Sequence, residues 1–373
     1  MRVLHGPVNV GNQPWVLSRN ERALGVSSDL VVKHGTWLHY PADRYLSEST
    51  NGVLSRWDNL KCAYFGLTAP LHYDVLHYYF GRSYLGQPGA PLTRHFLDLR
   101  LARRLGRTIF MTLQGCDVRQ SGLNSGRNAI TMCHVGQCQV AATCRASIDR
   151  DRRELIDNIL PLCNRVFALN PDLINDVPNA HFLPYASVDV ESFQPIWPRT
   201  DGPMRILHAP SDESIKGSRF ILEAIERLKT RWDIELILVK KLPYEEALKR
   251  YASADLVIDQ LLAGWYGGFA VEMMAMGKPV ACYIRKSDLA HVPEAMRRAL
   301  PLLNVSIPTL EADLEALLMR LREWNEWGRR SREFVLTWHH PRRIANAMVR
   351  AYRDPAAPFQ LDLATEEATR CAA

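Results

Sequence analysis

The chain has 373 residues, of which 47% are hydrophobic and 23% charged, a composition typical of soluble globular proteins with room for two domains. Apolar runs all stay well below the roughly 20 residues that a membrane-spanning helix needs, which excludes an integral membrane protein. The net charge of +6, from 46 basic and 40 acidic residues, suits an anionic small molecule or an acidic membrane surface better than a nucleic acid.

The first half of the chain alternates short apolar strands with helices. A strand is predicted at residues 2–5 ("RVLH"), and a helix from Pro14 to about Leu24 follows a glycine-containing loop. Further strands are predicted at residues 27–32, 73–81, 108–115 and 165–170, with another helix at residues 96–106. This alternation predicts a parallel sheet that carries helices on both faces.

The second half restarts the same order after a polar, proline-containing linker at residues 190–203. Neither half has the G-x-G-x-x-G motif after its opening strand, since Gly6 and Gly11 are too far apart, so a dinucleotide cofactor is not expected. We predict an N-terminal domain over residues 1–195, a C-terminal domain over residues 196–340, and a final helix with a tail over residues 341–373.

Two loops of the second half carry groups suited to an anion. In "GWYGGFAVEMMAMGKPV", Gly267 and Gly268 precede a short helix whose first amides and dipole favour a diphosphate. In "SDESIKG", Lys216 follows another strand end and so reaches the same edge of a parallel sheet. Glu272 lies one turn into the short helix, where it either binds a ribose or is an acid that faces solvent.

Parts of the chain resemble the GT-B glycosyltransferases, and among them the retaining family 4. The resemblance is strongest in "ILHAPSDESIKGSRFILEAIERL" and "ASADLVIDQLLAGWYGGFAVEMMAMGKPV", and weaker in "LARRLGRTIFMTLQGCDVR". It implies an α/β fold of two facing Rossmann-like domains with parallel sheets, and a C-terminal helix, "PRRIANAMVRAY", that crosses back to the first domain. It also implies a nucleotide-sugar donor in the second domain, an acceptor in the first, and no metal required for transfer.

Three positions depart from the usual motifs of that family. An acid eight positions before Glu272 is usual, but the residue here is Gly264. The usual arginine of the phosphate-binding loop is Pro210, and the usual histidine of the first domain is Gln114, in "QGCD", where Asp117 is kept. These changes leave the diphosphate with one clear cation and replace a proton-handling group by an amide.

The resemblance assigns roles to the predicted site residues. Lys216 and the amides of Gly267, Gly268 and Phe269 would stabilise the leaving diphosphate, and Glu272 would bind the ribose. Two residues of the first domain, Gln114 and Asp117, would orient hydroxyls of the sugar or the acceptor. The remaining predicted contacts of the donor are Gly11, Asn12, Ser211, Lys240 and Tyr266.

Three functions remain open from the sequence. The first is transfer of a sugar from a UDP- or GDP-sugar to a hydroxyl-bearing acceptor, with retention of the anomeric configuration. The second is epimerisation of a nucleotide sugar, and the third is a non-catalytic nucleotide-sugar binding homologue, in view of the three departures. No nucleic-acid partner is expected, and the sequence specifies neither the acceptor nor the oligomeric state.

Four of the eight cysteines lie close together in the sequence: Cys116, Cys133, Cys138 and Cys144. They predict a structural zinc site, although the spacing C-x4-C-x5-C is looser than the C-x2-C pairs of most zinc sites. The alternative is a set of reduced thiols in an irregular insertion. The N-terminus, "MRVLHGPVNV", lacks the features of a secretory leader, so we expect a cytoplasmic protein without a disulfide framework.

The helix predicted at residues 96–106 carries a basic stripe. Its members, spaced i, i+3, i+4 and i+7 with leucines 97, 101 and 105 opposite, are Arg100, Arg103, Arg104 and Arg107. The stripe is either an ordinary solvent face over an apolar one or a peripheral contact with acidic lipids at the inner face of a membrane.

Overall fold

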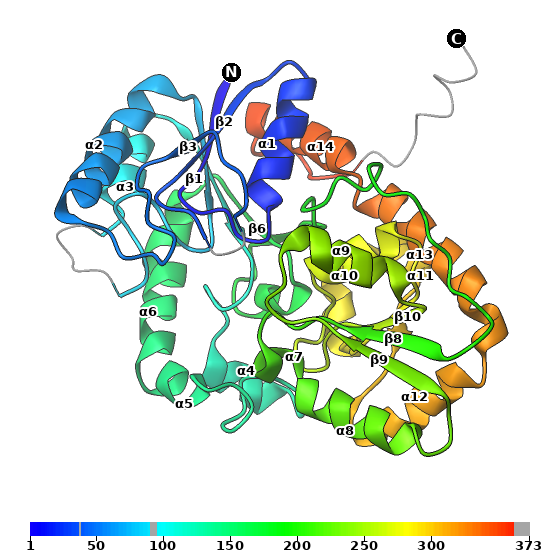
Figure 1. Cartoon of the computed structure of the whole chain (residues 1–373). Coiled ribbons are helices and arrows are strands. Elements are labelled where there is room, and N and C mark those ends of the chain that lie inside the picture. The colour runs from blue at the N-terminus through cyan, green and yellow to red at the C-terminus, as the bar shows by residue number, and fades with distance from the viewer. Residues whose placement is uncertain (37–38, 90–94, 362–373) are drawn as a thin grey trace, which may run out of the picture. The chain divides into compact units, whose positions relative to one another are not determined.

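The computed structural model describes residues 1–36, 39–89 and 95–361 of the chain (Figure 1). The chain divides into two compact units. The first contains residues 1–118, 150–189 and those from Thr337 onward, and the second contains residues 119–149 and 190–336. The domain boundaries after residues 195 and 340 stay predictions, and the predicted tail beyond residue 361 lies outside the described residues.

The first unit is built on a parallel sheet. Over the described residues this sheet has seven strands in the order β3-β2-β1-β4-β5-β6-β7. The strands are β1 (Arg2–Gly6), β2 (Ser27–Val32), β3 (Arg44–Tyr45), β4 (Val75–Tyr79), β5 (Thr108–Leu113), β6 (Arg165–Ala168) and β7 (His181–Phe182). All five residues of β4 are buried, as expected for an inner strand with helices on both faces.

The helices of the first half connect these strands and also form the insertion that belongs to the second unit. They are α1 (Gln13–Ala23), α2 (Arg56–His72), α3 (Leu97–Arg104), α4 (Ser121–Arg127), α5 (Ala141–Thr143) and α6 (Asp149–Glu154). Shorter π and 3-10 turns lie at Cys144–Ile148, Leu155–Ile159, Leu160–Leu162 and Pro171–Asn175.

The last helix, α14 (Pro341–Arg353), belongs to the first unit and packs against α1. Its Tyr352 hydroxyl donates to Glu21 Oε1 at 3.0 Å and lies 2.7 Å from His77 Nδ1, and all three side chains are buried. Polar contacts inside the unit therefore hold α14 in place together with apolar packing, and the predicted return of the last helix to the first domain is confirmed.

The second unit contains a smaller parallel sheet. Its five strands within the described residues are ordered β12-β11-β10-β8-β9. They are β8 (Met204–His208), β9 (Ile234–Leu238), β10 (Leu256–Ile258), β11 (Val280–Cys282) and β12 (Leu303–Asn304). The helices are α7 (Glu213–Lys216), α8 (Ser218–Leu228), α9 (Tyr244–Ser253), α10 (Gly268–Ala275), α11 (Glu294–Ala299), α12 (Leu310–Leu318) and α13 (Trp324–Trp338).

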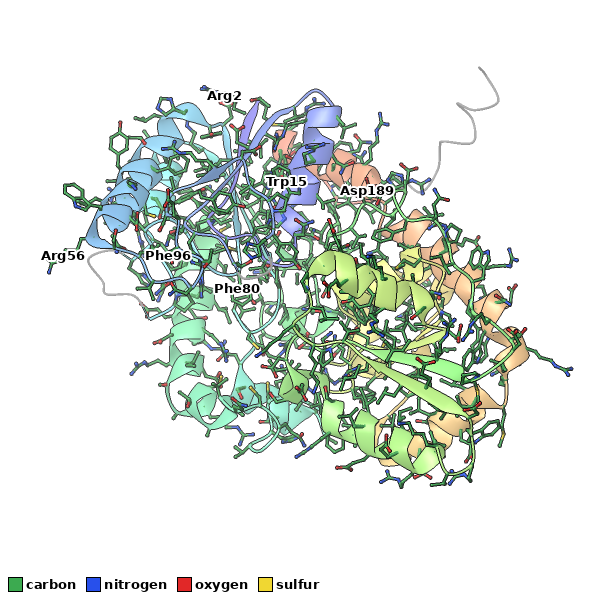
Figure 2. The ribbon with its side chains drawn as sticks, viewed as in Figure 1. Arg2, Trp15, Arg56, Phe80, Phe96 and Asp189 are labelled. Atoms are coloured by element: carbon green, nitrogen blue, oxygen red, sulfur yellow. The ribbon has the colours of Figure 1, made fainter. Side chains whose placement is uncertain are left out.

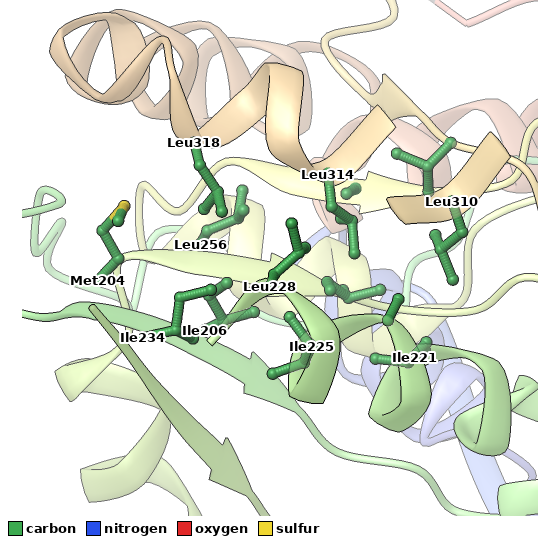
Figure 3. Packing of buried hydrophobic residues seen from close by; sticks show 14 of the residues in the cluster. Met204, Ile206, Ile221, Ile225, Leu228, Ile234, Leu256, Leu310, Leu314 and Leu318 are labelled. Atoms are coloured by element: carbon green, nitrogen blue, oxygen red, sulfur yellow. The ribbon is translucent and has the colours of Figure 1, made fainter. Parts of the chain in front are cut away.

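A large apolar core of the second unit lies where α8 and α12 cover the sheet (Figure 3). On α8 the buried residues Ile221, Ile225 and Leu228 follow the spacing of one helix face. Each such side chain contributes about 2 kcal/mol through its removal from water. The residues that meet them from α12 and from the strands are Leu310, Leu314, Leu318, Ile206 and Leu256.

Candidate functional site

Two loops of the second unit leave its sheet at the same edge. β8 and β10 are parallel neighbours, so the residues after His208 and after Ile258 both lie at the carboxyl ends of strands. The loop after β8 forms the short helix α7, whose first amides are capped by Asp212 Oδ1, at 2.9 Å from Ser214 N. Gly217 ends α7 with a φ of 76°, a left-handed conformation that favours glycine.

Lys216 is held beside the start of α10 by Asp259. The Lys216 Nζ donates to Asp259 Oδ1 at 2.6 Å, and Asp259 Oδ2 accepts the N–H of Gly267 at 2.9 Å. A Cβ on Gly267 would lie 3.5 Å from the Lys216 Nζ. The structure thus brings together the two predicted loops through an acid that was not singled out from the sequence. The signal in the sequence that could have identified Asp259 is its position directly after the apolar strand β10.

The start of α10 offers main-chain donors to this edge. The N–H groups of Gly268 and Phe269 have no acceptor within α10, because the acceptors would precede the helix. The N–H of Gly267, the third predicted donor, is bound to Asp259. The Phe269 ring packs against Tyr251 of α9, with ring centroids 5.3 Å apart, so Phe269 can serve an anion through its main chain only.

Glu272 is half-buried on α10 and accepts a hydrogen bond from the Tyr244 hydroxyl. Burial raises the pKa of Glu272 to about 7, while the hydrogen bond from Tyr244 acts in the opposite direction. Glu272 is thus partly buried and bound to Tyr244, and its contact with a ribose stays a prediction. Tyr244 is the first residue of α9, 28 positions from Glu272, and nothing in the local sequence connects the two.

The other predicted donor contacts of the second unit lie in different settings. Ser211 is exposed in the loop after β8. Lys240, after β9, forms an exposed ion pair with Glu213 at 2.8 Å, of a kind that contributes little to stability. Tyr266 is fully buried, with its ring centroid 4.4 Å from that of Trp265, and therefore acts through packing.

Gly264, where the resembling family has an acid, lies against the guanidinium of Arg285. Gly264 has a φ of 78°, and a Cβ there would come within 2.6 Å of Arg285 Cζ. Arg285 is 5% exposed, and it donates to Asp288 Oδ2 at 2.7 Å and to the carbonyl oxygen of Ile130 at 2.8 Å. This position therefore has no room for a side chain and faces a positive charge.

In the first unit, Asp117 shapes the turn after β5. Its carboxylate accepts the N–H groups of Gln114 at 3.0 Å and Gly115 at 2.7 Å, and the side chain is buried. Asp117 thus holds the main chain of Gln114, the other predicted site residue of this turn, in place. The Gln114 side chain donates to the carbonyl oxygen of Val10 at 3.2 Å and connects this turn to the loop after β1.

Side-chain amides gather around the loop after β1, and each has one buried polar atom without a hydrogen-bond partner among the described residues. These atoms are Asn9 Oδ1, Asn12 Oδ1, Gln13 Nε2 and Gln114 Oε1. Gly11 and Asn12 both adopt left-handed conformations, with φ of 60° and 61°, as the loop turns into α1. Buried polar atoms normally find partners, so this loop is suited to a polyhydroxyl ligand.

Two basic residues also follow strand ends of the first sheet. Lys33 comes directly after β2 and Arg82 follows β4, and both side chains are half-buried. Burial is the main cause that lowers the pKa of each, and in the part of the chain that the structure describes neither forms an ion pair. Lys33 is absent from the residues predicted from the sequence. The signal that could have identified it is its position as a basic residue at the end of the apolar strand β2.

The structure does not support the prediction of a structural zinc site. Cys116 belongs to the first unit, whereas the second holds Cys133, Cys138 and Cys144. No group of three or more metal-ligating side chains is placed to hold an ion within residues 1–36, 39–89 and 95–361. Cys133 instead packs in a small apolar cluster with Leu262, so its sulfur serves the interior of the unit. The seven cysteines that the structure describes form no disulfide.

The basic helix also differs from its prediction. Leu97 and Leu105, expected on the apolar face of the helix, are 43% and 41% exposed. The buried residues of α3 are instead Asp98, Leu99 and Ala102. None of the helices described in the structure has the length and apolar character that spanning a membrane requires.

Comparison with known proteins places this geometry in context. No family profile matches the chain. The MMP alpha-(1->4)-mannosyltransferase of Mycolicibacterium hassiacum is 29% identical over 207 residues, and the match covers 46% of this chain and 47% of that protein. The chain thus spans about half the length of this curated relative.

Several solved structures share the fold. A glycosyltransferase from Rickettsia africae has a TM-score of 0.59 at 12% identity, over 94% of this chain and 97% of its own. Sucrose-phosphate synthase from Thermosynechococcus elongatus has a TM-score of 0.55 at 14% identity, over 95% and 98%. UDP-GlcNAc 2-epimerase from Neisseria meningitidis, bound to UDP-GlcNAc, has a TM-score of 0.52 at 11% identity, over 94% and 99%.

These identities carry information on the fold alone, and membership of retaining family 4 stays a prediction. Two parallel α/β sheets, a last helix that returns to the first unit, and neighbours that include glycosyltransferases agree with the predicted architecture. The chain therefore has the GT-B fold of glycosyltransferases.

Proposed function

We propose that the protein transfers a sugar from a nucleoside-diphosphate sugar to a hydroxyl-bearing acceptor. The observation that carries the proposal is the position of the Lys216 ammonium, which Asp259 holds beside the first residue before α10. A cation next to the N-terminus of a helix, at the carboxyl edge of a parallel sheet, is an arrangement suited to a diphosphate.

On the donor side, Lys216 and the amides of Gly268 and Phe269 bind the diphosphate. The ammonium has three N–H donors, of which Asp259 takes one, so the others are available to phosphate oxygens. Because the Lys216–Asp259 pair is neutral overall, the site stabilises a leaving group through positioned donors rather than through net charge. Each such donor contributes on the order of 3 kcal/mol in the transition state. Glu272 in its ionised form accepts hydrogen bonds from the ribose.

The transfer itself breaks the bond between the anomeric carbon and the diphosphate oxygen and forms a bond from that carbon to the acceptor oxygen. The acceptor proton passes to an oxygen of the leaving phosphate, and the configuration at the anomeric carbon is retained. This step requires no metal, and UDP- or GDP-sugars are the donors we expect. The resemblance to retaining family 4 supports this stereochemistry.

The acceptor side lies in the first unit, at the loop after β1 and the turn after β5. The buried oxygens Asn12 Oδ1 and Gln114 Oε1 are acceptors without partners among the described residues. Hydroxyl groups of the acceptor, or of the transferred sugar, supply the missing donors. Asp117 fixes the turn that carries Gln114 and acts as a positioning residue.

A thermal-shift screen with UDP-, GDP-, TDP- and ADP-sugars tests the donor site, because a ligand bound to the folded state raises its apparent stability. We expect one of the nucleotides to raise Tm in the wild type but not in Lys216→Ala. Lys229→Ala, which removes an exposed lysine of an ion pair directly after the end of α8, is the matched control. If no nucleotide sugar raises Tm, or if Lys216→Ala keeps the full response, the proposed site is wrong.

Product analysis separates the proposal from the alternatives. A transferase releases free sugar and nucleoside diphosphate from its donor slowly when water replaces the acceptor. An epimerase returns a nucleotide sugar of altered configuration, and a binding homologue leaves the donor unchanged. Chromatography of the donor after prolonged incubation with the protein therefore decides among the three functions.

A further inference from the structure

α2 packs against the rest of the first unit through small side chains. Its buried residues are Cys62, Gly66, Ala69 and Pro70. A Cβ on Gly66 would come within 2.8 Å of the Tyr84 Cβ, so the backbone of α2 lies very close to the residues beneath it. The helix is well formed at its start, where Ser55 and Asp58 make a reciprocal capping box. The inner face of α2 is thus specified by small residues.

The large apolar side chains of α2 lie on its outer face. Their spacing of three, four, three and four residues makes a single stripe about 21 Å long on a helix that rises 1.5 Å per residue. The members and their exposed fractions are Trp57 75%, Leu60 58%, Tyr64 75%, Leu67 44% and Leu71 57%. A helix in a globular protein normally turns such a stripe toward the core, and a continuous exposed patch of this kind indicates a binding surface.

Positive charge accompanies this stripe. Arg56, at the start of α2 (Figure 2), and Lys61 are both exposed. The neighbouring helix α3, which packs against α2, adds the exposed residues Arg103 and Arg104 and the exposed leucines 97 and 105.

The acids of the two helices balance only one of these charges, that of Lys61, and among the described residues Arg56, Arg103 and Arg104 form no ion pair. Asp58 is half-buried in the capping box, where its carboxylate also accepts a hydrogen bond from Lys61 at 3.3 Å. Asp98 is fully buried and binds the Ser83 hydroxyl and the N–H of Tyr84. The outer side of α2 and α3 is therefore apolar, aromatic and basic.

We propose that the outer face of α2, with the exposed arginines of α3, docks on a membrane that contains anionic lipids. Leucine side chains enter the boundary between headgroups and acyl chains, while Trp and Tyr favour that boundary because they combine an apolar ring with a polar group. Each basic residue near an anionic surface strengthens the attraction to the membrane. The helix lies in the plane of the membrane surface and does not cross it.

The charges favour a membrane over a second copy of the chain. The 3-4 spacing of the stripe would also suit pairing with another helix. A second copy, however, would bring the same three arginines (Arg56, Arg103 and Arg104) into the contact, and like charges close together are unfavourable. This proposal rests on contacts within the first unit and is independent of the proposed sugar transfer.

Co-sedimentation of the full chain with vesicles tests the proposal. We expect binding to vesicles of phosphatidylcholine mixed with phosphatidylglycerol, weaker binding to phosphatidylcholine alone, and weaker binding at high salt. Simultaneous Trp57→Ser, Leu60→Ser and Tyr64→Ser changes should reduce binding to the anionic vesicles by at least about tenfold, because the apolar area that enters the lipid is lost. The pair Arg103→Glu and Arg104→Glu should remove the preference for anionic lipid.

The matched control replaces three apolar side chains of the second unit by serine: Leu123 (50% exposed), Val140 (52%) and Met319 (69%). It should bind vesicles as the wild type does, and circular dichroism verifies the fold of each variant. The proposal is overturned if the wild type binds neither kind of vesicle, or if the α2 variant binds as well as the control. It is also overturned if analytical ultracentrifugation shows a dimer that the α2 variant converts to a monomer, since α2 would then pair with a second copy.

Discussion

Asp259 Oδ1 lies 2.6 Å from the Lys216 Nζ, and both side chains are largely buried, at 1% and 11% exposure. Asp259→Asn removes the negative charge and leaves the ammonium of Lys216 without a counter-charge. Breaking a buried pair in this way costs about 3 kcal/mol or more. We therefore expect a lower free energy of unfolding in urea titrations, together with weaker binding of the nucleotide that raises Tm in the wild type.

The double variant Lys216→Met with Asp259→Leu is the reference for this prediction. Because it removes both charges, it should recover much of the lost stability while it still fails to bind a nucleotide. A single Asp259→Asn variant as stable as the wild type would contradict the importance of the pair. Full nucleotide binding by the double variant would contradict the proposed donor site.

Glu272 makes stability depend on pH in a specific direction. Its pKa in the folded protein is about 7, above the ordinary value of 4.5, because burial disfavours the ionised form. The folded state therefore holds a proton that the unfolded state has lost between these pH values, and the contribution of Glu272 to stability falls as pH rises from 4.5 to about 7. Glu272→Gln should raise Tm relative to the wild type at pH 8 and change it little at pH 4.5.

The same substitution should weaken nucleotide binding, because an amide replaces one of the two acceptor oxygens offered to the ribose. Gain of stability and loss of binding in one variant are what a functional carboxyl in an unfavourable environment predicts. Glu245→Gln, an exposed acid in the first turn of α9, is the control and should alter neither property. An unchanged difference in Tm between the wild type and Glu272→Gln from pH 4.5 to pH 8 would show that Glu272 titrates normally.

Gly264 cannot simply regain the acid of the resembling family. A Cβ at this position would lie 2.6 Å from Arg285 Cζ, and the φ of 78° strongly favours glycine. Gly264→Ala should therefore lower the free energy of unfolding by about 2 kcal/mol or more, from backbone strain and overpacking together. The Arg285→Ala background removes the clash and keeps the strain, so Gly264→Ala should cost less there. Equal costs in the two backgrounds, measured by urea unfolding, would show that the guanidinium moves aside freely.

Sequence patterns were sufficient for the fold and for the meeting of two loops at one edge of the second sheet. Apolar strands that alternate with helices specify a parallel sheet, and the carboxyl ends of its strands are where Lys216 and Gly267 meet. Their partners could not be predicted with the same rules. Asp259 is 43 positions from Lys216, and Tyr244 is 28 positions from Glu272, so each contact depends on how the helices pack over the sheet.

Two expectations that the structure does not support, the zinc site and the apolar face of α3, share a physical cause. Cysteine spacing predicts a metal only if the chain folds the sulfurs together, and here Cys133 packs in an apolar cluster with Leu262, which is distant in the sequence. The spacing of Leu97 and Leu105 predicts an apolar face, but the buried side of α3 is set by the close approach of α2, where Gly66 lies near Asp98. In both cases a local pattern was overridden by contacts between segments distant in the sequence.

A substitution of Gln114 tests the acceptor side of the proposed function. Its Nε2 donates to the Val10 carbonyl oxygen at 3.2 Å, while the buried Oε1 has no partner among the described residues. Gln114→Met keeps the approximate size and removes both polar atoms, so it should cost only about 1 kcal/mol of stability. If Oε1 orients a hydroxyl, the variant should release sugar from the donor about tenfold more slowly, with the nucleotide-induced rise in Tm unchanged.

Gln137→Met in the second unit, which removes an acceptor for Arg219, is the control and should leave both measurements as in the wild type. Parallel loss of turnover and of nucleotide binding in Gln114→Met would instead assign Gln114 to the donor.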